Sequence, residues 1–195
     1  MPRAPRILIE GGLYHVYNRF ARGEEVFAES EEAIEFLDLL RELKKRDGLQ
    51  VFAWSLLSKH FHLAVRTFAV PLSRTMRTLQ GGYSKAFNQR WRRTGPLWQS
   101  RYQTRLVNDQ QYIGQLIIYI HLNPVRSGLV EDPMNHVFSG HREMLGNVLG
   151  KPPDVVSRWA RKGAERRLSD PEFAEAIDQL DSFLAGPFPT IPNDQ

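Results

Sequence analysis

Apolar residues in the first 130 positions of this chain follow two different spacings, and the order of these spacings limits the fold. Strand patterns, alternating in residues 11–19 and continuously apolar in the buried segment 49–57, are predicted over residues 11–19, 49–57, 60–67 and 104–107, and helical spacing covers residues 30–46, 72–91 and 109–122. We expect Pro124 to end the last helix, because proline disfavours helical backbone at the preceding residue. This order predicts an α+β fold: a split βαβ arrangement on one antiparallel sheet, with helices on one face.

The length of 195 residues suits one sizeable domain with an appendage, or two small domains. Gly and Pro interrupt the pattern near residue 140, so we expect one domain over residues 1–140 and a helical C-terminal extension with a Pro-rich tail over residues 141–195. Two short helices are expected there, over residues 154–162 and 170–184. No apolar stretch approaches the roughly 18–20 residues that cross a bilayer, and the N-terminus has no secretory signal. We expect a cytoplasmic protein that does not bind membranes.

The basic residues of the chain are concentrated in its middle third. Residues 48–108 contain ten basic side chains and no acidic one; because the whole chain carries +4, the remainder carries −6. This asymmetry is typical of a surface that binds a polyanion, and a chance excess of surface charge is the alternative. The candidates for phosphate contacts are Arg74, Arg77, Lys85, Arg90, Arg92, Arg93, Arg101 and Arg105. Trp98 and Tyr102 are candidates for stacking on unpaired bases, with core packing as the alternative.

A first group with chemical potential is His60-Phe61-His62, within a predicted strand. Residues two apart in a strand project from the same face, so both imidazoles point one way while Phe61 faces the core. Two adjacent imidazoles are suited to share one divalent metal. A surface or hydrogen-bonded histidine pair is the alternative. The chain contains no cysteine, which excludes a disulfide, a thiolate metal site and a cysteine nucleophile.

A second group lies on the predicted helix before Pro124. Tyr119 and Asn123 are four residues apart and therefore share one face of that helix. The alternative is a core tyrosine followed by an asparagine at the helix end. A tyrosine has a pKa near 10, so it becomes a nucleophile only when it is activated and the target phosphate is held in line. Together the two groups offer a site for a metal ion, which polarises a phosphate oxygen. They also offer an oxygen nucleophile, which suits DNA strand transfer.

Four segments carry a family resemblance: GGLYHVYNR at the start, WSLLSKHFHLAV around the histidines, GPLWQSRYQTRLV before the third helix, and YIHLNPVRSGLV. Over roughly residues 9–140 the chain resembles the single-tyrosine HUH transposases of small bacterial insertion sequences, and most closely the REP-associated tyrosine transposases. The resemblance implies a ferredoxin-like (RRM-like) sheet, a homodimer, and binding of hairpin-forming single-stranded DNA. It also implies cleavage through a 5′-phosphotyrosine with Mg²⁺ or Mn²⁺.

The resemblance also implies roles for individual residues. His60 and His62 match the HUH metal ligands, Tyr119 matches the nucleophile, and Asn123 matches the third ligand one turn later. Tyr112 on the same helix is the rival nucleophile. The chain departs from the family pattern in two places: Ser58-Lys59 stands where Pro-Asn is usual, and Phe138-Ser139-Gly140 stands where Trp-Ser-Ser is usual.

We therefore expect a nucleoid-associated DNA transposase that cleaves and rejoins hairpin-containing single-stranded DNA. The alternative is a non-catalytic protein that retains the fold and binds single-stranded or hairpin nucleic acid. An RNA-binding RRM-like protein ranks last, because the chain lacks a good match to the aromatic RNA-binding signature. For His15, a hydrogen-bonded strand histidine is favoured over a metal ligand, and for Arg126 a solvated helix end is favoured over a DNA contact.

Overall fold

The computed structural model describes residues 9–107 and 110–148. Four strands and four α-helices follow one another along the chain, with short 3₁₀ turns at Ala21–Gly23, Val26–Ala28 and Pro133–Asn135. The elements are β1 (Leu13–Arg19), α1 (Ser30–Asp47), β2 (Gln50–Leu57), β3 (His60–Arg66), α2 (Leu72–Arg90), β4 (Gln103–Val107), α3 (Gln110–Arg126) and α4 (His141–Val148). This order confirms the predicted succession of strands and helices up to α3.

The four strands form one antiparallel sheet in the order β2-β3-β1-β4. Both central strands, β1 and β3, come from segments that are rich in aromatic and β-branched residues, which suit a half-buried pleated surface. The sheet order with crossovers through α1 and α2 is the ferredoxin-like arrangement, so the predicted fold class is confirmed.

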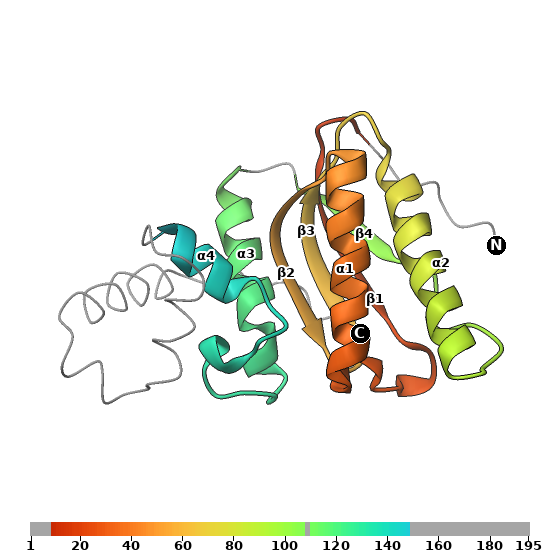
Figure 1. Cartoon of the computed structure of the whole chain (residues 1–195). Helices are drawn as coiled ribbons and strands as arrows, with labels where there is room; N and C mark the ends of the chain where they lie inside the picture. Colours follow the sequence, from red (N-terminus) through yellow and green to blue (C-terminus); the bar gives the residue numbers. More distant parts are fainter. Residues whose placement is uncertain (1–8, 108–109, 149–195) are drawn as a thin grey trace, which may run out of the picture.

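The two faces of the sheet have different partners. Phe61, Leu63 and Val65 point into the main core, which they share with apolar residues of α1 and α2. In Figure 1, α1 and α2 lie in front of the sheet. The opposite face carries His60, His62 and Ala64, because residues alternate along a strand.

The prediction of helices on one face holds for α1 and α2 but is wrong for α3. Ala53 of β2 and Ala64 of β3 pack against Leu116 and Ile120 of α3, on the face opposite α1 and α2. Small alanine side chains on the strands let the helix backbone approach the sheet closely. The histidine-bearing face is therefore partly covered by α3.

The expected helix end at Pro124 is also wrong, because α3 runs through Pro124 to Arg126. The residue that closes the helix is Gly128, two positions after its end, which has a left-handed φ of 69°. The Leu129 N–H donates to the Pro124 carbonyl and the Gly128 N–H donates to the Val125 carbonyl, each at 2.9 Å. These two bonds form the motif that commonly closes a helix at glycine. Asn123 consequently lies inside the helix.

Part of the outer edge of β2 is covered by the segment before α4. The Leu56 N–H donates to the Phe138 carbonyl at 2.8 Å, and the Gly140 N–H donates to the Trp54 carbonyl at 2.9 Å. These bonds add a short stretch of pairing beside β2, with a bridge between Ser55 and Ser139. Of the expected C-terminal extension only α4 is described, and the helices predicted over residues 154–162 and 170–184 lie outside the described residues. No helix in the described part of the chain has both the length and the apolar character needed to cross a membrane.

Candidate active site and nucleic-acid interface

The histidine pair on β3 lies on one side of the sheet, as the alternation predicts. The ring centres of His60 and His62 are 5.1 Å apart and the rings are perpendicular, at 87°. His62 is buried and His60 is half-buried. The structure therefore brings the two imidazoles together at the start of β3.

A third histidine, His15 of β1, contacts this pair. Its Nε2 atom lies 3.0 Å from Nδ1 of His62, and the two rings stack at 5.2 Å. Tyr17, two residues along β1, also stacks on His62, with ring centres 5.7 Å apart. The interpretation of His15 as a hydrogen-bonded strand histidine is confirmed. Its partner could not be inferred, because the contact depends on the pairing of β1 with β3.

Burial lowers the pKa of His62 well below its usual value, and the neighbouring His15 and His60 lower it further. His62 is therefore neutral at pH 7. A neutral imidazole is the form that binds a metal ion. The charge state of His62 thus suits the role that the sequence predicts for it.

Helix α3 places Tyr119 against the same histidines. The Tyr119 ring centre is 5.9 Å from that of His15 and 5.7 Å from that of His62, with edge-to-face geometry in both cases. We call the group formed by His15, Tyr17, His60, His62 and Tyr119 the histidine–tyrosine cluster. The side chain of the rival Tyr112 lies outside the described residues.

Asn123 lies one turn after Tyr119 and is buried. Its Oδ1 atom accepts a hydrogen bond from the Ser127 hydroxyl at 3.3 Å. A cavity of about 210 Å³ is lined by Ser127 and Leu129 beyond the end of α3 and by His60 at the start of β3. The C-terminal end of α3 and the start of β3 therefore border the same space.

The donors at this site suit a divalent cation. Within residues 9–107 and 110–148, no group of three or more His, Cys, Asp or Glu side chains could hold a metal ion. The sequence predicts His60, His62 and an amide oxygen from Asn123 as the ligands of such an ion. Carbonyl oxygens suit Mg²⁺ and Mn²⁺, and neutral imidazoles bind divalent transition metals. The residues present fit the predicted ion.

Residues 10–123 match the model of a protein family described as "Transposase IS200 like". The match covers more than half of the chain. The chain belongs to the IS200-like transposase family. Comparison with curated proteins gives no match.

Two solved structures are similar to this member of the family. It is similar to a REP-associated tyrosine transposase bound to a REP hairpin, with a TM-score of 0.66 and 20% identity over 79% of this chain and 90% of that chain. It is also similar to a structure from Deinococcus radiodurans R1 assigned as a transposase, with a TM-score of 0.42 and 19% identity over 60% of this chain and 96% of that chain. The first of these likenesses supports the fold.

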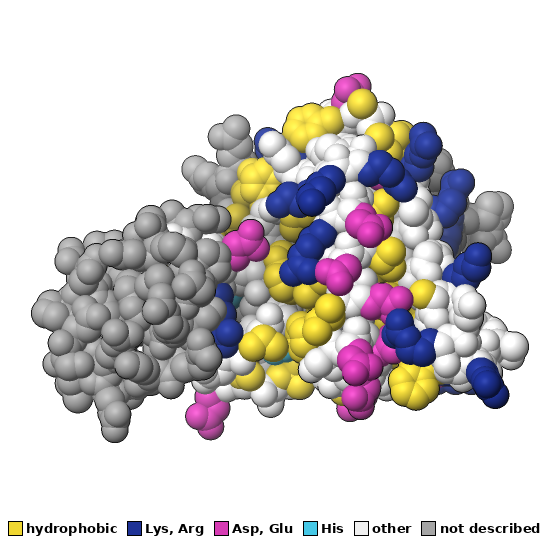
Figure 2. All heavy atoms as spheres, in the orientation of Figure 1, with side chains coloured by type: hydrophobic (Ala, Val, Ile, Leu, Met, Phe, Trp, Pro, Cys, Tyr) yellow, Lys and Arg dark blue, Asp and Glu magenta, His cyan; other side chains and the backbone are white. Residues whose placement is uncertain are grey.

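The basic residues predicted to bind DNA fall into groups that the sequence does not distinguish. Arg90 is paired with the buried Glu32 at 2.7 Å and with Glu35 at 2.6 Å. Arg93 forms two hydrogen bonds to the Glu24 carboxylate, at 2.6 and 2.7 Å. These acidic partners lie 55 or more positions earlier in the chain, so the acid-free block acquires acidic neighbours on folding. Figure 2 shows acidic and basic side chains intermixed on the face formed by α1 and α2.

The remaining basic residues lie on two sides of the sheet. Arg74, Arg77 and Lys85 are exposed on α2, which covers the face opposite the histidines. Arg105 of β4 is exposed and pairs across the strands with His15, so it lies on the histidine-bearing face. Arg92 and Arg101 are exposed in the segment between α2 and β4.

Two further basic residues, which sequence reasoning did not favour as DNA contacts, also lie near the cluster. Arg19 of β1 is exposed and pairs with His60 across the strands. Arg126 is exposed, and its guanidinium lies over the Tyr119 ring, 5.4 Å from the ring centre. The alternation of β1 and the seven-residue spacing between Tyr119 and Arg126 are the signals that could have found them.

The two predicted base-stacking residues are packed against the core. Tyr102 is buried within the main core. Trp98 stacks on Phe20 with ring centres 4.6 Å apart, and its indole N–H donates to the Gln80 carbonyl at 3.1 Å. These contacts favour core packing, the alternative that the sequence left open for both residues.

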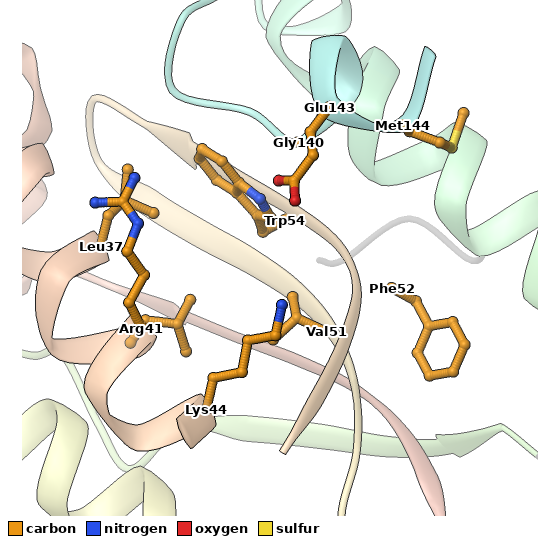
Figure 3. A pocket seen from close by; sticks show the side chains of 10 residues that line it. Leu37, Arg41, Lys44, Val51, Phe52, Trp54, Gly140, Glu143 and Met144 are labelled. Atoms are coloured by element: carbon orange, nitrogen blue, oxygen red, sulfur yellow. The ribbon is translucent and has the colours of Figure 1, made fainter. Parts of the chain in front are cut away.

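A second cavity, of about 260 Å³, lies between α1, β2 and α4 (Figure 3). Arg41 and Lys44 of α1 and Glu143 of α4 line it around Trp54. None of the residues predicted to form the active site lines this cavity. It is thus separate from the histidine–tyrosine cluster.

A second histidine pair lies where α4 contacts α3. The rings of His121 and His141 are 5.4 Å apart, both side chains are buried, and among the described residues their four ring nitrogens have no hydrogen-bond partner. Burial lowers the pKa of His121 to about 3 and that of His141 to about 4. Both imidazoles are therefore neutral at pH 7.

Proposed function

We propose that the chain is a metal-assisted single-tyrosine transposase that cleaves and rejoins hairpin-containing single-stranded DNA, with Tyr119 as the nucleophile. The observation that supports this most is the packing of Tyr119 against His62, with ring centres 5.7 Å apart. These residues come from a helix and a strand that lie far apart in the sequence. Membership of the transposase family supplies the reaction class.

The proposed step exchanges one phosphate ester for another. The Tyr119 oxygen forms a bond to phosphorus and the phenol proton passes to solvent or to a base. The bond from phosphorus to the 3′ oxygen of the preceding nucleotide breaks, and that oxygen takes up a proton to leave a free 3′-OH. The resulting 5′-phosphotyrosine conserves the cleaved bond, so a 3′-OH can later reverse the step without an external energy source.

His60, His62 and Asn123 are the proposed ligands of Mg²⁺ or Mn²⁺. When bound, such an ion polarises a phosphate oxygen and stabilises the charge that develops during attack. The chain's own part is to present the two imidazoles and the buried Asn123 amide to the ion. Arg19, Arg105 and Arg126 surround the cluster with positive charge that would hold the DNA backbone.

We also propose a hairpin as the DNA partner. The structure with a TM-score of 0.66 is that of a transposase bound to a REP hairpin, and its fold is shared by this chain. A homodimer, a location in the cytoplasm at the nucleoid, and a separate extension over residues 141–195 complete the proposal. Light scattering of the purified protein checks the dimer.

The decisive experiment uses single-stranded hairpins labelled at the 3′ end and incubated with the protein and Mn²⁺. A 5′-phosphotyrosine links the protein to the 3′ fragment, so a labelled adduct that survives denaturation is expected. Tyr119→Phe should lose the adduct and Tyr112→Phe should keep it. The opposite pattern would assign the nucleophile to Tyr112.

Absence of an adduct on every hairpin would overturn the enzymatic proposal. Binding that survives both Tyr119→Phe and a chelator, without any adduct, would then support the non-catalytic alternative. A preference for ribose-containing hairpins would support the RNA-binding alternative.

A further inference from the structure

We infer that His15 is a positioning residue that holds His62 with its Nε2 atom available to the metal ion. Its importance for catalysis rests on the proposed function, but the orientation of His62 is testable without DNA. The observation that carries the inference is the 3.0 Å contact between Nε2 of His15 and Nδ1 of His62.

This contact requires one proton between the two rings, carried by either Nε2 of His15 or Nδ1 of His62. Two ring nitrogens at hydrogen-bond distance share a single proton, because two N–H groups would repel and two lone pairs would not bond. If Nδ1 of His62 donates to Nε2 of His15, then Nε2 of His62 keeps its lone pair for the metal. Metal-binding histidines generally donate their other ring N–H to a partner that fixes tautomer and ring orientation.

Strand pairing explains why His15 can take this position. His15 stands opposite Ala64 of β3, and the small alanine side chain leaves room for the imidazole to lean toward His62. His15 is buried, so little water competes for the contact. The Tyr17 ring lies tilted against His15, with ring centres 5.1 Å apart, and stacks on His62 at 5.7 Å, which restricts the rotation of both rings.

The first test reads the tautomer of His62 directly. Long-range ¹H–¹⁵N spectra of the metal-free, full-length protein report which ring nitrogen of each histidine carries the proton. We expect His62 to be protonated at Nδ1. A His62 protonated at Nε2 would overturn the inference. This test uses only the wild-type protein, so it does not depend on whether the variants fold.

The second test measures Mn²⁺ affinity by electron paramagnetic resonance. His15→Phe keeps a ring but removes the acceptor, and we expect Mn²⁺ affinity to fall about 10–100-fold. His15→Gln offers a side-chain carbonyl as an acceptor and should recover most of the affinity. Gly81→Ala on α2 is the control, because its Cβ would meet nothing, and should bind Mn²⁺ like the wild type.

A folded His15→Phe variant with unchanged Mn²⁺ affinity would overturn the inference. So would equal losses in His15→Phe and His15→Gln, because His15 would then act through its bulk alone. Failure of the proposed function looks different: no hairpin yields an adduct, while Mn²⁺ affinity still depends on residue 15.

Discussion

Arg126 holds its guanidinium carbon 5.4 Å from the centre of the Tyr119 ring. The two residues are seven positions apart on α3, which places them on the same face two turns from each other. An exposed guanidinium can also contact a phosphate. Arg126 is thus placed to contact both a phosphate and Tyr119, the proposed nucleophile, rather than only to end a helix.

Arg126→Gln should slow adduct formation about 10-fold, less than the 10²–10³-fold loss of a fully oriented catalytic donor. The fall should appear in the single-turnover rate measured with saturating hairpin. Arg126→Lys retains the charge and should recover part of the rate. An unchanged rate in Arg126→Gln would show that the contact with Tyr119 is structural only.

Arg105→Gln should weaken hairpin binding and reduce the slope of log affinity against log salt concentration by about one. The reason is that Arg105 lies on the same face as the histidine–tyrosine cluster. Fluorescence anisotropy at several salt concentrations measures the slope. Equal slopes for the wild type and Arg105→Gln would place the DNA elsewhere.

Arg90→Gln should act on stability instead. Arg90 pairs with the buried Glu32, which also accepts hydrogen bonds from Tyr83 and Trp91. Because the guanidinium is partly exposed, we expect a loss on the order of 1 kcal/mol in the free energy of unfolding. Urea denaturation measures it, and the salt slope of hairpin binding should stay at the wild-type value. A lower slope would show that Arg90 contacts DNA despite its carboxylate partners.

The free energy of unfolding should fall as the pH drops from about 6.5 toward 4. His121 and His141 have pKa values lowered to about 3 and about 4, chiefly by burial, while Asp132 raises and Arg142 lowers that of His141. The unfolded chain therefore binds more protons across this interval, and each histidine contributes up to about 1.4 kcal/mol per pH unit. Urea denaturation at a series of pH values measures the slope.

His141→Gln removes one titrating group and is expected to reduce that slope by about one proton. His62 and His136 also have lowered pKa values, so a residual slope remains. A slope identical to that of the wild type would mean that His141 is already accessible to protons in the folded protein.

Gly140→Ala should destabilise the protein by about 1–3 kcal/mol, the usual cost of overpacking. A Cβ atom at this position would lie 2.8 Å from Nε1 of Trp54 and 3.5 Å from Nε2 of His121. Thermal unfolding followed by circular dichroism checks this, with Gly81→Ala as the control because its Cβ would meet nothing. Equal melting temperatures for the two variants would contradict the crowding at Gly140.

Local patterns sufficed for most of the fold and for part of the site. Alternation along β3 placed His60 and His62 on one face, and helical spacing placed Tyr119 and Asn123 together. The end of α3 was misjudged because Pro124 gives up only its own N–H, whereas Gly128 provides the left-handed backbone that closes the helix. The rule about the residue before proline is a tendency that tertiary packing overrides here.

Contacts between distant segments could not be predicted. The partner of His15 depends on the register of β1 against β3, which alternation alone does not fix. The pairing of Arg90 with Glu32 joins residues 58 positions apart. The acid-free stretch of the sequence therefore suggested more arginines without carboxylate partners than the folded protein has.

The sheet lies between α2, which carries Arg74, Arg77 and Lys85, and the histidine–tyrosine cluster. The β2 edge of the sheet is partly covered by the segment 138–140. At the other edge, β4 has a neighbouring strand on one side only in the described part of the chain. A nucleic acid that touched both sides would have to bend around β4, beside Arg105. Its curvature would then be set by the thickness of one sheet and one helix, which favours a short, looped ligand over a straight duplex.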